Sequence, residues 1–278
     1  MYPDTIFLGM GLYDICIAIG VLAVLLCADR LCVKKGFSLG LQKLVIIAIV
    51  GAVVIGFFGA IIFQAFYDWL DTGVFSLKAG MTFYGGFIFG VGGYLLFWFV
   101  ISKPFGVYQE ARLRTRDVAD MAGCLVPLAH GFGRLGCLFA GCCHGNLTDA
   151  WYGITMWVEV EGVWQWAKVV PVQLFESMFL FALAAIAFWI YFKRNEEKNK
   201  RIPILPTYFI AYGIWRFFIE FLRGDERGSS PIPFLTPSQL TAVILIAVGV
   251  GYFMIWFMNK RKLTEDCDDE KNGSDASI

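Results

Sequence analysis

Apolar residues are gathered along this chain into seven long stretches that are separated by shorter polar segments. A membrane-spanning α-helix needs about 20 mostly apolar residues, at a rise of about 1.5 Å per residue. Each stretch therefore predicts one transmembrane helix, and the fold expected is an all-α integral membrane protein, a bundle of seven transmembrane helices. The predicted spans are 12–28, 44–66, 81–101, 118–143, 171–192, 203–222 and 237–258.

Basic residues are concentrated in alternate loops. Lys and Arg are frequent after the first, third and fifth spans and after the last one, and they are sparse in the opposite loops. Short cytoplasmic loops collect basic residues, so this asymmetry predicts an N-terminus outside and a cytoplasmic C-terminus. The residues before the first span contain no Lys or Arg. A signal peptide would have a basic region there, so we expect the first helix to be retained.

The domain organisation predicted from this pattern is simple. Residues 1–258 form one seven-span membrane domain, and the acidic segment 259–278 forms a cytoplasmic, disordered tail. The external loop 144–170 is rich in Trp, whose indole ring favours the membrane interface.

Composition agrees with a membrane protein and excludes some other classes. The chain is 58% hydrophobic and 17% charged, with a mean hydropathy of +0.64, which is too apolar for an ordinary soluble domain. Lys plus Arg and Asp plus Glu each total 23, so no basic excess indicates a nucleic-acid partner. Most of the 8 Cys lie in apolar segments, where a thiol packs like a small apolar group, and we expect no disulfides.

Several predicted spans carry ionisable residues, which are costly in a membrane and indicate function by default. Residues three, four or seven apart share one face of a helix. The sixth span carries such a polar face at Tyr212, Arg216, Glu220 and Arg223. The fourth span carries another at His130, Arg134 and Cys137. The predicted orientation places both faces in the outer half of the membrane.

Arg134 and Arg216 would repel each other unless an anion lay beside them, and the guanidinium fork suits carboxylate or phosphate oxygens. Glu176 in the fifth span could supply that anion, and so could a lipid phosphate. The alternative is structural. In that interpretation Arg216 pairs with Glu220 within its helix and Arg134 pairs with Glu176, and both pairs serve only to hold the bundle together.

The segment HGFGRLGCLFAGCCHG, residues 130–145, combines glycines with three cysteines. The adjacent Cys142 and Cys143 do not match the spacing of a zinc knuckle, so we expect no metal, although a redox role of the thiols stays open. Gly85 and Gly86, which follow Tyr84, indicate a close helix contact or an exposed backbone donor site.

These segments together resemble one known family, the prolipoprotein diacylglyceryl transferases. GRLGCLFAGCCHG (133–145) is similar to the family signature G-R-x-G-N-F-x-N-G-E-x-x-G. YGIWRFFIEFLRGDERG (212–228) is similar to Y-G-x-x-R-F-x-x-E-F-x-R. Weaker similarities cover LYDICIAIG (12–20), MTFYGGFIFG (81–90), PVQLFES (171–177) and TPSQL (236–240), so the resemblance extends along most of the chain.

The resemblance implies transfer of the diacylglyceryl group of phosphatidylglycerol to the thiol of a lipobox cysteine, with release of glycerol phosphate. The acceptor is the signal peptide of a preprolipoprotein, the setting is the outer face of a bacterial cytoplasmic membrane, and no cofactor is implied. Arg134 and Arg216 match the family's essential arginines. The expected substrate-binding residues are Tyr13, Gly85, Gly86, Cys137, Cys142, Gly145, Glu176, Tyr212, Glu220 and Arg223.

The chain departs from the family pattern at three positions. Tyr84 replaces the histidine of H-G-G, Cys137 replaces an asparagine, and Cys142 replaces a glutamate of the signature. The family's proposed base is therefore absent, and a tyrosine, with a pKa of about 10, is a poor base at neutral pH. His130 is the alternative base, because a histidine ordinarily titrates near pH 6.5.

The residues expected to be catalytic are Arg134, Arg216, His130 and Tyr84. The three replacements leave two other functions open. One is a phospholipid-dependent transferase with a different acceptor, and the other is a non-enzymatic lipid-binding or thiol-redox membrane protein.

Overall fold

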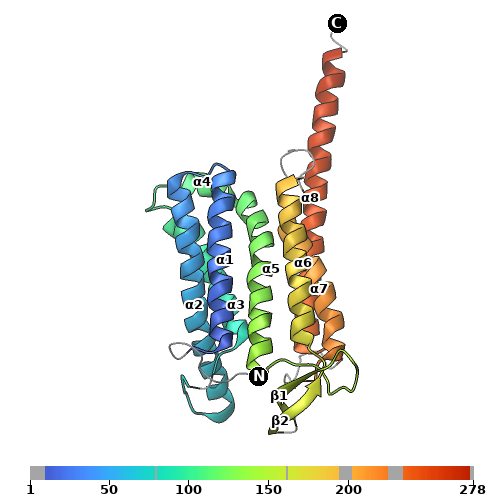
Figure 1. The fold of residues 1–278 in the computed structure, drawn as a ribbon. Coiled ribbons are helices and arrows are strands. Elements are labelled where there is room, and N and C mark those ends of the chain that lie inside the picture. Colours follow the sequence, from blue (N-terminus) through green and yellow to red (C-terminus); the bar gives the residue numbers. More distant parts are fainter. Residues whose placement is uncertain (1–9, 79, 161, 194–201, 225–233, 276–278) are drawn as a thin grey trace. The chain divides into compact units, whose positions relative to one another are not determined.

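The computed structural model describes residues 10–78, 80–160, 162–193, 202–224 and 234–275, and it consists mainly of long helices (Figure 1). The helices are α1 (Leu12–Lys34), α2 (Leu39–Thr72), α3 (Phe83–Leu96), α4 (Tyr108–Leu113), α5 (Thr115–Ala140), α6 (Val172–Lys193), α7 (Ile204–Ile219) and α8 (Pro237–Asp275). A π-helical stretch, Phe97–Ile101, continues α3, and a 3-10 turn, Glu220–Leu222, continues α7.

Six helices in the described part of the chain are long and apolar enough to cross a membrane. They lie in α1, α2, α3 with its π-helical extension, α5, α6 and the first part of α8. The predicted integral membrane protein is thereby confirmed. The sixth predicted span corresponds to α7, which has 16 residues before the 3-10 turn at Glu220. Seven spans and an external N-terminus stay predictions.

The helix ends differ from the predicted span ends for local reasons. Helix α1 continues through the basic residues to Lys34, and α2 begins at Leu39, directly after Ser38. The Ser38 hydroxyl accepts a hydrogen bond from the Leu41 backbone N–H at 3.2 Å, which is the geometry of an N-cap. Helix α5 ends at Ala140 rather than at 143, because Gly141 takes a φ of +74°.

The chain forms two compact units: Leu22–Val118, and Met1–Val21 with Ala119–Ile278. In the unit Leu22–Val118, α2 and α3 pack through glycines. A Cβ added to Gly56 would lie 2.9 Å from the carbonyl oxygen of Gly86, and one added to Gly85 would lie 2.7 Å from that of Gly59. The two backbones therefore touch, which larger residues would prevent.

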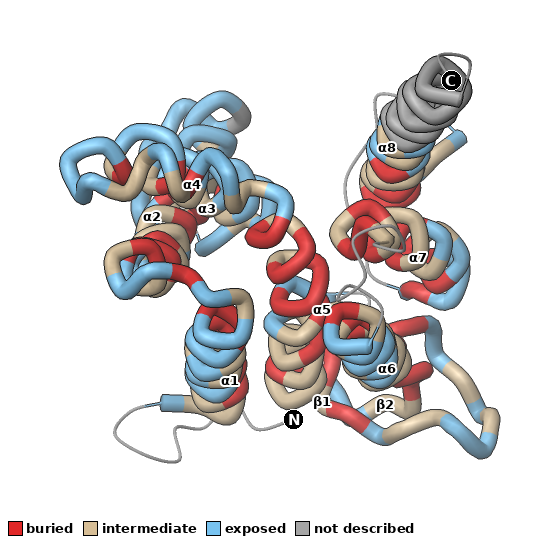
Figure 2. The backbone as a smooth tube through the Cα atoms, turned by 90° about the horizontal axis from the view of Figure 1, so that it is seen from above, coloured by how far each residue is buried: buried red, intermediate tan, exposed pale blue. Residues whose placement is uncertain are grey.

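In the other unit, α7 and α8 are also in close contact. A Cβ at Gly213 would lie 2.9 Å from the Ala242 carbonyl oxygen, and one at Gly249 would lie 3.0 Å from that of Pro206. Buried positions run along α5, α6 and α7, as the red segments in Figure 2 show. The polar faces of these helices are therefore held against protein.

The loop between α5 and α6 contains an antiparallel hairpin, which the all-α prediction missed. Strand β1 (Ile154–Val160) pairs with β2 (Val163–Val169), with Gly162 at a φ of +79° in the turn. Met156 and Val158 are fully buried on one face. Trp157 and Trp166 pair on the other, with ring centroids 5.6 Å apart. This alternation, which is typical of a half-buried strand, was present in the sequence.

The C-terminal segment differs from expectation in its backbone. Helix α8 continues to Asp275, across most of the segment 259–278 for which the sequence predicts disorder, and the side chains beyond 258 lie outside the described part. The division into a membrane domain and a tail stays a prediction.

Candidate functional site

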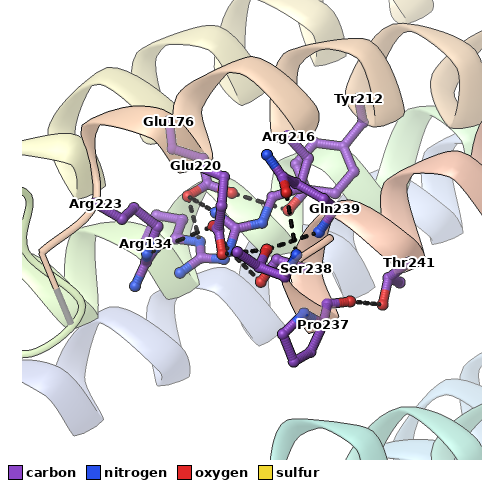
Figure 3. A network of polar contacts seen from close by, with 11 residues as sticks. Arg134, Glu176, Tyr212, Arg216, Glu220, Arg223, Pro237, Ser238, Gln239 and Thr241 are labelled. Atoms are coloured by element: carbon purple, nitrogen blue, oxygen red, sulfur yellow. Dashed lines mark hydrogen bonds and ion pairs between the residues drawn. The ribbon is translucent and has the colours of Figure 1, made fainter. Parts of the chain in front are cut away.

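A network of charged side chains is centred on Glu176 of α6, whose side chain is fully buried. The Arg134 Nε, from α5, lies 3.0 Å from the Glu176 Oε2, and the Arg216 Nη1, from α7, lies 3.7 Å from the same oxygen (Figure 3). The Tyr212 hydroxyl donates a hydrogen bond of 2.8 Å to the other oxygen, Oε1. One carboxylate therefore holds two guanidiniums from different helices.

Glu220 is the second anionic centre. Its Oε2 lies 2.8 Å from the Arg216 Nη2 and 3.8 Å from the Arg223 Nε. All three side chains are buried, so these ion pairs are weakly screened by solvent. Arg216 links the two glutamates. Both pairs proposed by the structural interpretation, Arg134 with Glu176 and Arg216 with Glu220, are present and belong to one network.

The start of α8, in the segment TPSQL (236–240), completes the network with hydroxyl groups. Arg216 donates from Nη2 to the Ser238 hydroxyl at 2.8 Å, and the Thr236 hydroxyl donates to the Glu220 Oε1 at 2.9 Å. Thr236 also caps α8. Its hydroxyl accepts from the Gln239 N–H at 3.1 Å, and its own N–H donates to the Gln239 Oε1 at 3.1 Å. This is a capping box, whose T-x-x-Q spacing is visible in TPSQL.

The network carries a net positive charge. Three arginines and two glutamates are joined by the ion pairs, which leaves a formal charge of one positive. Guanidiniums stay protonated in proteins and present paired N–H donors to phosphate oxygens. The arrangement is therefore suited to bind a singly charged anion beside the arginines.

His130 lies beside this network. It precedes Arg134 by one helical turn on α5, and its ring meets the Tyr212 ring edge-on, with centroids 4.9 Å apart and an interplanar angle of 69°. The predicted shared face of His130 and Arg134 is confirmed. Whether His130 acts as a base stays a prediction.

Three cysteines form a second cluster where α5 ends. The sulfur atoms of Cys137, Cys142 and Cys143 all lie within 4.8 Å of one another. Cys143 has a φ of +61°, the only non-glycine residue of the described chain with a positive φ. With Gly141 also left-handed, the chain turns back on the last turn of α5, which brings sequence neighbours 142 and 143 to Cys137.

The turn that holds these cysteines is fixed by α6 and by the segment after α7. The Gln173 side-chain amide donates to the Cys142 carbonyl at 2.7 Å, and the Gly145 N–H donates to the Val170 carbonyl at 2.9 Å. Gly145 also forms an isolated antiparallel bridge with Arg223. A Cβ at Gly145 would lie 2.6 Å from the Leu222 carbonyl oxygen, so only glycine permits this approach.

The thiols in the turn differ in acidity. Hydrogen bonds from Cys137 and Cys142 hold the pKa of Cys143 well below its ordinary value, and Arg223 and Arg134 act in the same direction. The hydrogen bond from Cys137 lowers the pKa of Cys142, but the hydrogen bond with Cys143 and burial outweigh it and raise the value to about 11. Negative charge is therefore favoured on Cys143.

The other predicted site residues lie in two places. The Tyr13 ring, on α1, packs against Gly136 of α5, where a Cβ would lie 3.0 Å from the ring. Tyr84, Gly85 and Gly86 belong to α3 in the unit Leu22–Val118. For Gly85 the contact with α2 shows the close helix packing that the sequence analysis named as one alternative.

Comparison with known proteins places this chain in a family. The model of the prolipoprotein diacylglyceryl transferase family matches residues 5–256. A phosphatidylglycerol–prolipoprotein diacylglyceryl transferase of Clostridium tetani is 30% identical over 247 residues, covering 87% of this chain and 92% of the relative. One of Clostridium perfringens is 31% identical over 263 residues, covering 92% and 95%.

A more distant relative of the same name, from Xylella fastidiosa, is 26% identical over 264 residues and covers 83% of both chains. The matches include the helices that carry both the arginine network and the cysteine cluster. This multi-pass bacterial membrane protein therefore belongs to the prolipoprotein diacylglyceryl transferase family.

Proposed function

We propose that this protein transfers the diacylglyceryl group of phosphatidylglycerol to the thiol of a lipobox cysteine in a preprolipoprotein signal peptide. The observation that carries the proposal is the buried network in which Glu176 holds Arg134 and Arg216 side by side. The names of the relatives from both Clostridium species support the reaction and its two substrates.

The setting that we propose is the outer face of the bacterial cytoplasmic membrane. Basic residues are concentrated in the loops predicted to be cytoplasmic, and the polar residues of α5, α6 and α7 then fall in the outer half of a seven-span bundle. A phosphatidylglycerol headgroup in the outer leaflet would reach the arginines without crossing the membrane.

The arginines would stabilise the charge that develops on the leaving group. As the thiolate sulfur attacks the glycerol carbon, the bond from that carbon to the phosphate oxygen breaks, and a thioether and glycerol phosphate are formed. The phosphate changes from a singly charged diester to a monoester with more negative charge. Donors that are already oriented by Glu176 and Glu220 stabilise this added charge more than that of the bound lipid.

The acceptor thiol must lose its proton, because a cysteine ordinarily titrates near pH 8.5 and only the thiolate attacks. We propose His130 as the base and Tyr84 as a hydroxyl that orients a substrate. His130→Ala then loses activity that Tyr84→Phe retains. Equal activity of the wild type and His130→Ala would remove His130 from the mechanism.

We assign the remaining predicted residues to substrate binding. Glu220 and Tyr212 would orient the arginines, while Arg223 would contact the headgroup. Tyr13 and the glycines would leave room for the lipid. The whole set is Tyr13, Gly85, Gly86, Cys137, Cys142, Gly145, Glu176, Tyr212, Glu220 and Arg223.

The direct test is transfer by the purified protein in detergent. Labelled phosphatidylglycerol is offered with a lipobox peptide or with a twin peptide in which the acceptor Cys is replaced by Ser. We expect a thioether product on the Cys peptide alone. Arg216→Lys keeps the charge but loses the paired donors, and we expect at least about a tenfold loss of kcat/KM. Bound lipid without product on any thiol peptide would contradict the proposed acceptor.

A further inference from the structure

The cysteine cluster at the end of α5 has thiol chemistry that the proposed transfer step does not use, because that step relies on arginines and on an acceptor thiol of the other substrate. Its three sulfur atoms come from two short pieces of chain and lie within 4.8 Å of one another. Cys142 is exposed, while Cys137 and Cys143 are partly buried. The cluster is therefore within reach of a solute.

The distances fit a common metal ion. Thiolates bind Zn²⁺ at about 2.3 Å, so tetrahedral ligands lie about 3.8 Å apart. The three sulfur atoms lie within 4.8 Å of one another, and rotation of their side chains would bring them to that separation. The spacing of the cysteines lacks C-x2-C and therefore predicts no metal. The left-handed backbone at Gly141 and Cys143 nevertheless brings the three sulfur atoms together.

The residues around the turn hold the three cysteines in position. The turn is fixed by the hydrogen bonds from Gln173 to Cys142 and from Gly145 to Val170. A left-handed conformation at a residue with a side chain is unfavourable, and it persists where the surrounding structure imposes it. Three thiolates with one divalent ion carry a net charge of one negative, and the Arg223 and Arg134 guanidiniums act on Cys143 with the opposite sign.

We propose that Cys137, Cys142 and Cys143 form a binding site for one thiophilic divalent cation of the Zn²⁺ type. The three sulfurs bind the ion as thiolates, the thiol protons pass to solvent, and water takes the fourth position on the exposed side at Cys142. The ion would tie the turn after α5 to the last turn of that helix. Cys137 and Cys142 also belong to the proposed substrate-binding set, but metal binding uses their sulfur atoms and no arginine, and it goes beyond the transfer reaction.

The test uses the full chain in detergent, reduced and freed of metal with a chelator, and Cd²⁺ as the probe. Cadmium thiolates have a sulfur-to-metal charge-transfer band in the ultraviolet, so the increase in absorbance during the titration reports sulfur ligands directly. We expect saturation at about one ion per chain, and competition from Zn²⁺ when Zn²⁺ is present in large excess. Cys137→Ser and Cys143→Ser should each weaken binding at least about 100-fold, because loss of a ligand costs more than loss of a supporting hydrogen bond. Cys27→Ser, on α1, is the matched control and should bind as the wild type does.

A second measurement needs no variant. Zn²⁺ should slow alkylation of the three clustered thiols in the wild-type protein, as followed by mass mapping, and leave Cys27 unchanged. The proposal is overturned if the reduced wild type shows no cadmium–thiolate band, or if the band survives in both serine variants. Neither measurement depends on transfer, so a failure here and a failure of the proposed function are distinguishable.

Discussion

Different kinds of contact hold two groups of helices together. One group is α2 with α3, and the other is α5 to α8. The α2–α3 contact is made of glycine backbones, as where Gly85 meets the Gly59 carbonyl oxygen. The contact of α5, α6 and α7 is made of buried charges, with Arg134 and Arg216 both on Glu176. A lipid environment allows either solution, because apolar side chains gain little there by leaving lipid for protein.

The difference indicates where function lies. Close glycine packing contributes van der Waals contacts and brings no charged group into the membrane. Buried ion pairs are costly to desolvate, and well-packed apolar residues often replace them without loss of stability. We therefore propose that the five charged groups of this network are kept in a membrane helix bundle for binding rather than for stability, and the variants below test that proposal.

The largest effect is expected for Glu176→Gln. The change leaves two buried guanidiniums without their shared anion, and breaking such a pair costs about 3–5 kcal/mol of the free energy of unfolding. Tyr212→Phe removes only one hydrogen bond to the same carboxylate and should cost about 1–2 kcal/mol. Thermal unfolding in detergent measures both. Equal shifts in the two variants would mean that the charge of Glu176 does not organise the network.

The next effect concerns the glycine contact. In Gly85→Ala the new Cβ would lie 2.5 Å from the Phe63 Cβ and 2.7 Å from the Gly59 carbonyl oxygen, so α2 and α3 must separate. Overpacking of this kind costs about 1–3 kcal/mol. The matched control is Gly92→Ala on the same helix, where the added Cβ meets nothing within 4 Å. Stability of Gly85→Ala equal to that of the control would contradict close packing.

A smaller effect is expected at the start of α8. Thr236→Val removes the cap and the hydrogen bond to Glu220, at a cost of about 1–2 kcal/mol. It should also lower transfer, because Glu220 orients Arg216. Thr241→Val loses the hydrogen bond to the Pro237 carbonyl on the same helix and serves as control. If both variants transfer equally well, the start of α8 has no part in positioning the arginines.

The smallest effect is a difference in reactivity between neighbouring thiols of the metal-free protein. Cys142, with a pKa raised to about 11, is mostly protonated at neutral pH, so its alkylation rate should rise about tenfold per pH unit between about pH 6 and 8. Cys143, whose pKa is lowered by hydrogen bonds from the other two thiols, should react at a nearly constant rate. Parallel pH profiles in mass mapping would show that hydrogen bonds from the other two thiols do not lower the pKa of Cys143.

Part of this architecture could be predicted from the periodicity of apolar and polar residues along the chain. Apolar stretches of spanning length predicted the long helices, and the spacing of Tyr212, Arg216 and Glu220 placed them on one face. Such patterns are local consequences of helix geometry and of the cost of exposing polar groups to lipid. The hairpin at 154–169 was missed, because strand alternation is a weak signal next to a Trp-rich loop.

By itself, the sequence determined that this is a membrane protein, which helices carry charge, and which family its motifs resemble. Only the tertiary structure decided that Glu176 joins Arg134 to Arg216, and that Ser238 and Thr236 complete the network. It also decided that Cys137 meets Cys142 and Cys143. The physical reason is that these meetings depend on helix packing and on two left-handed residues in one turn, which no regular spacing along the chain encodes.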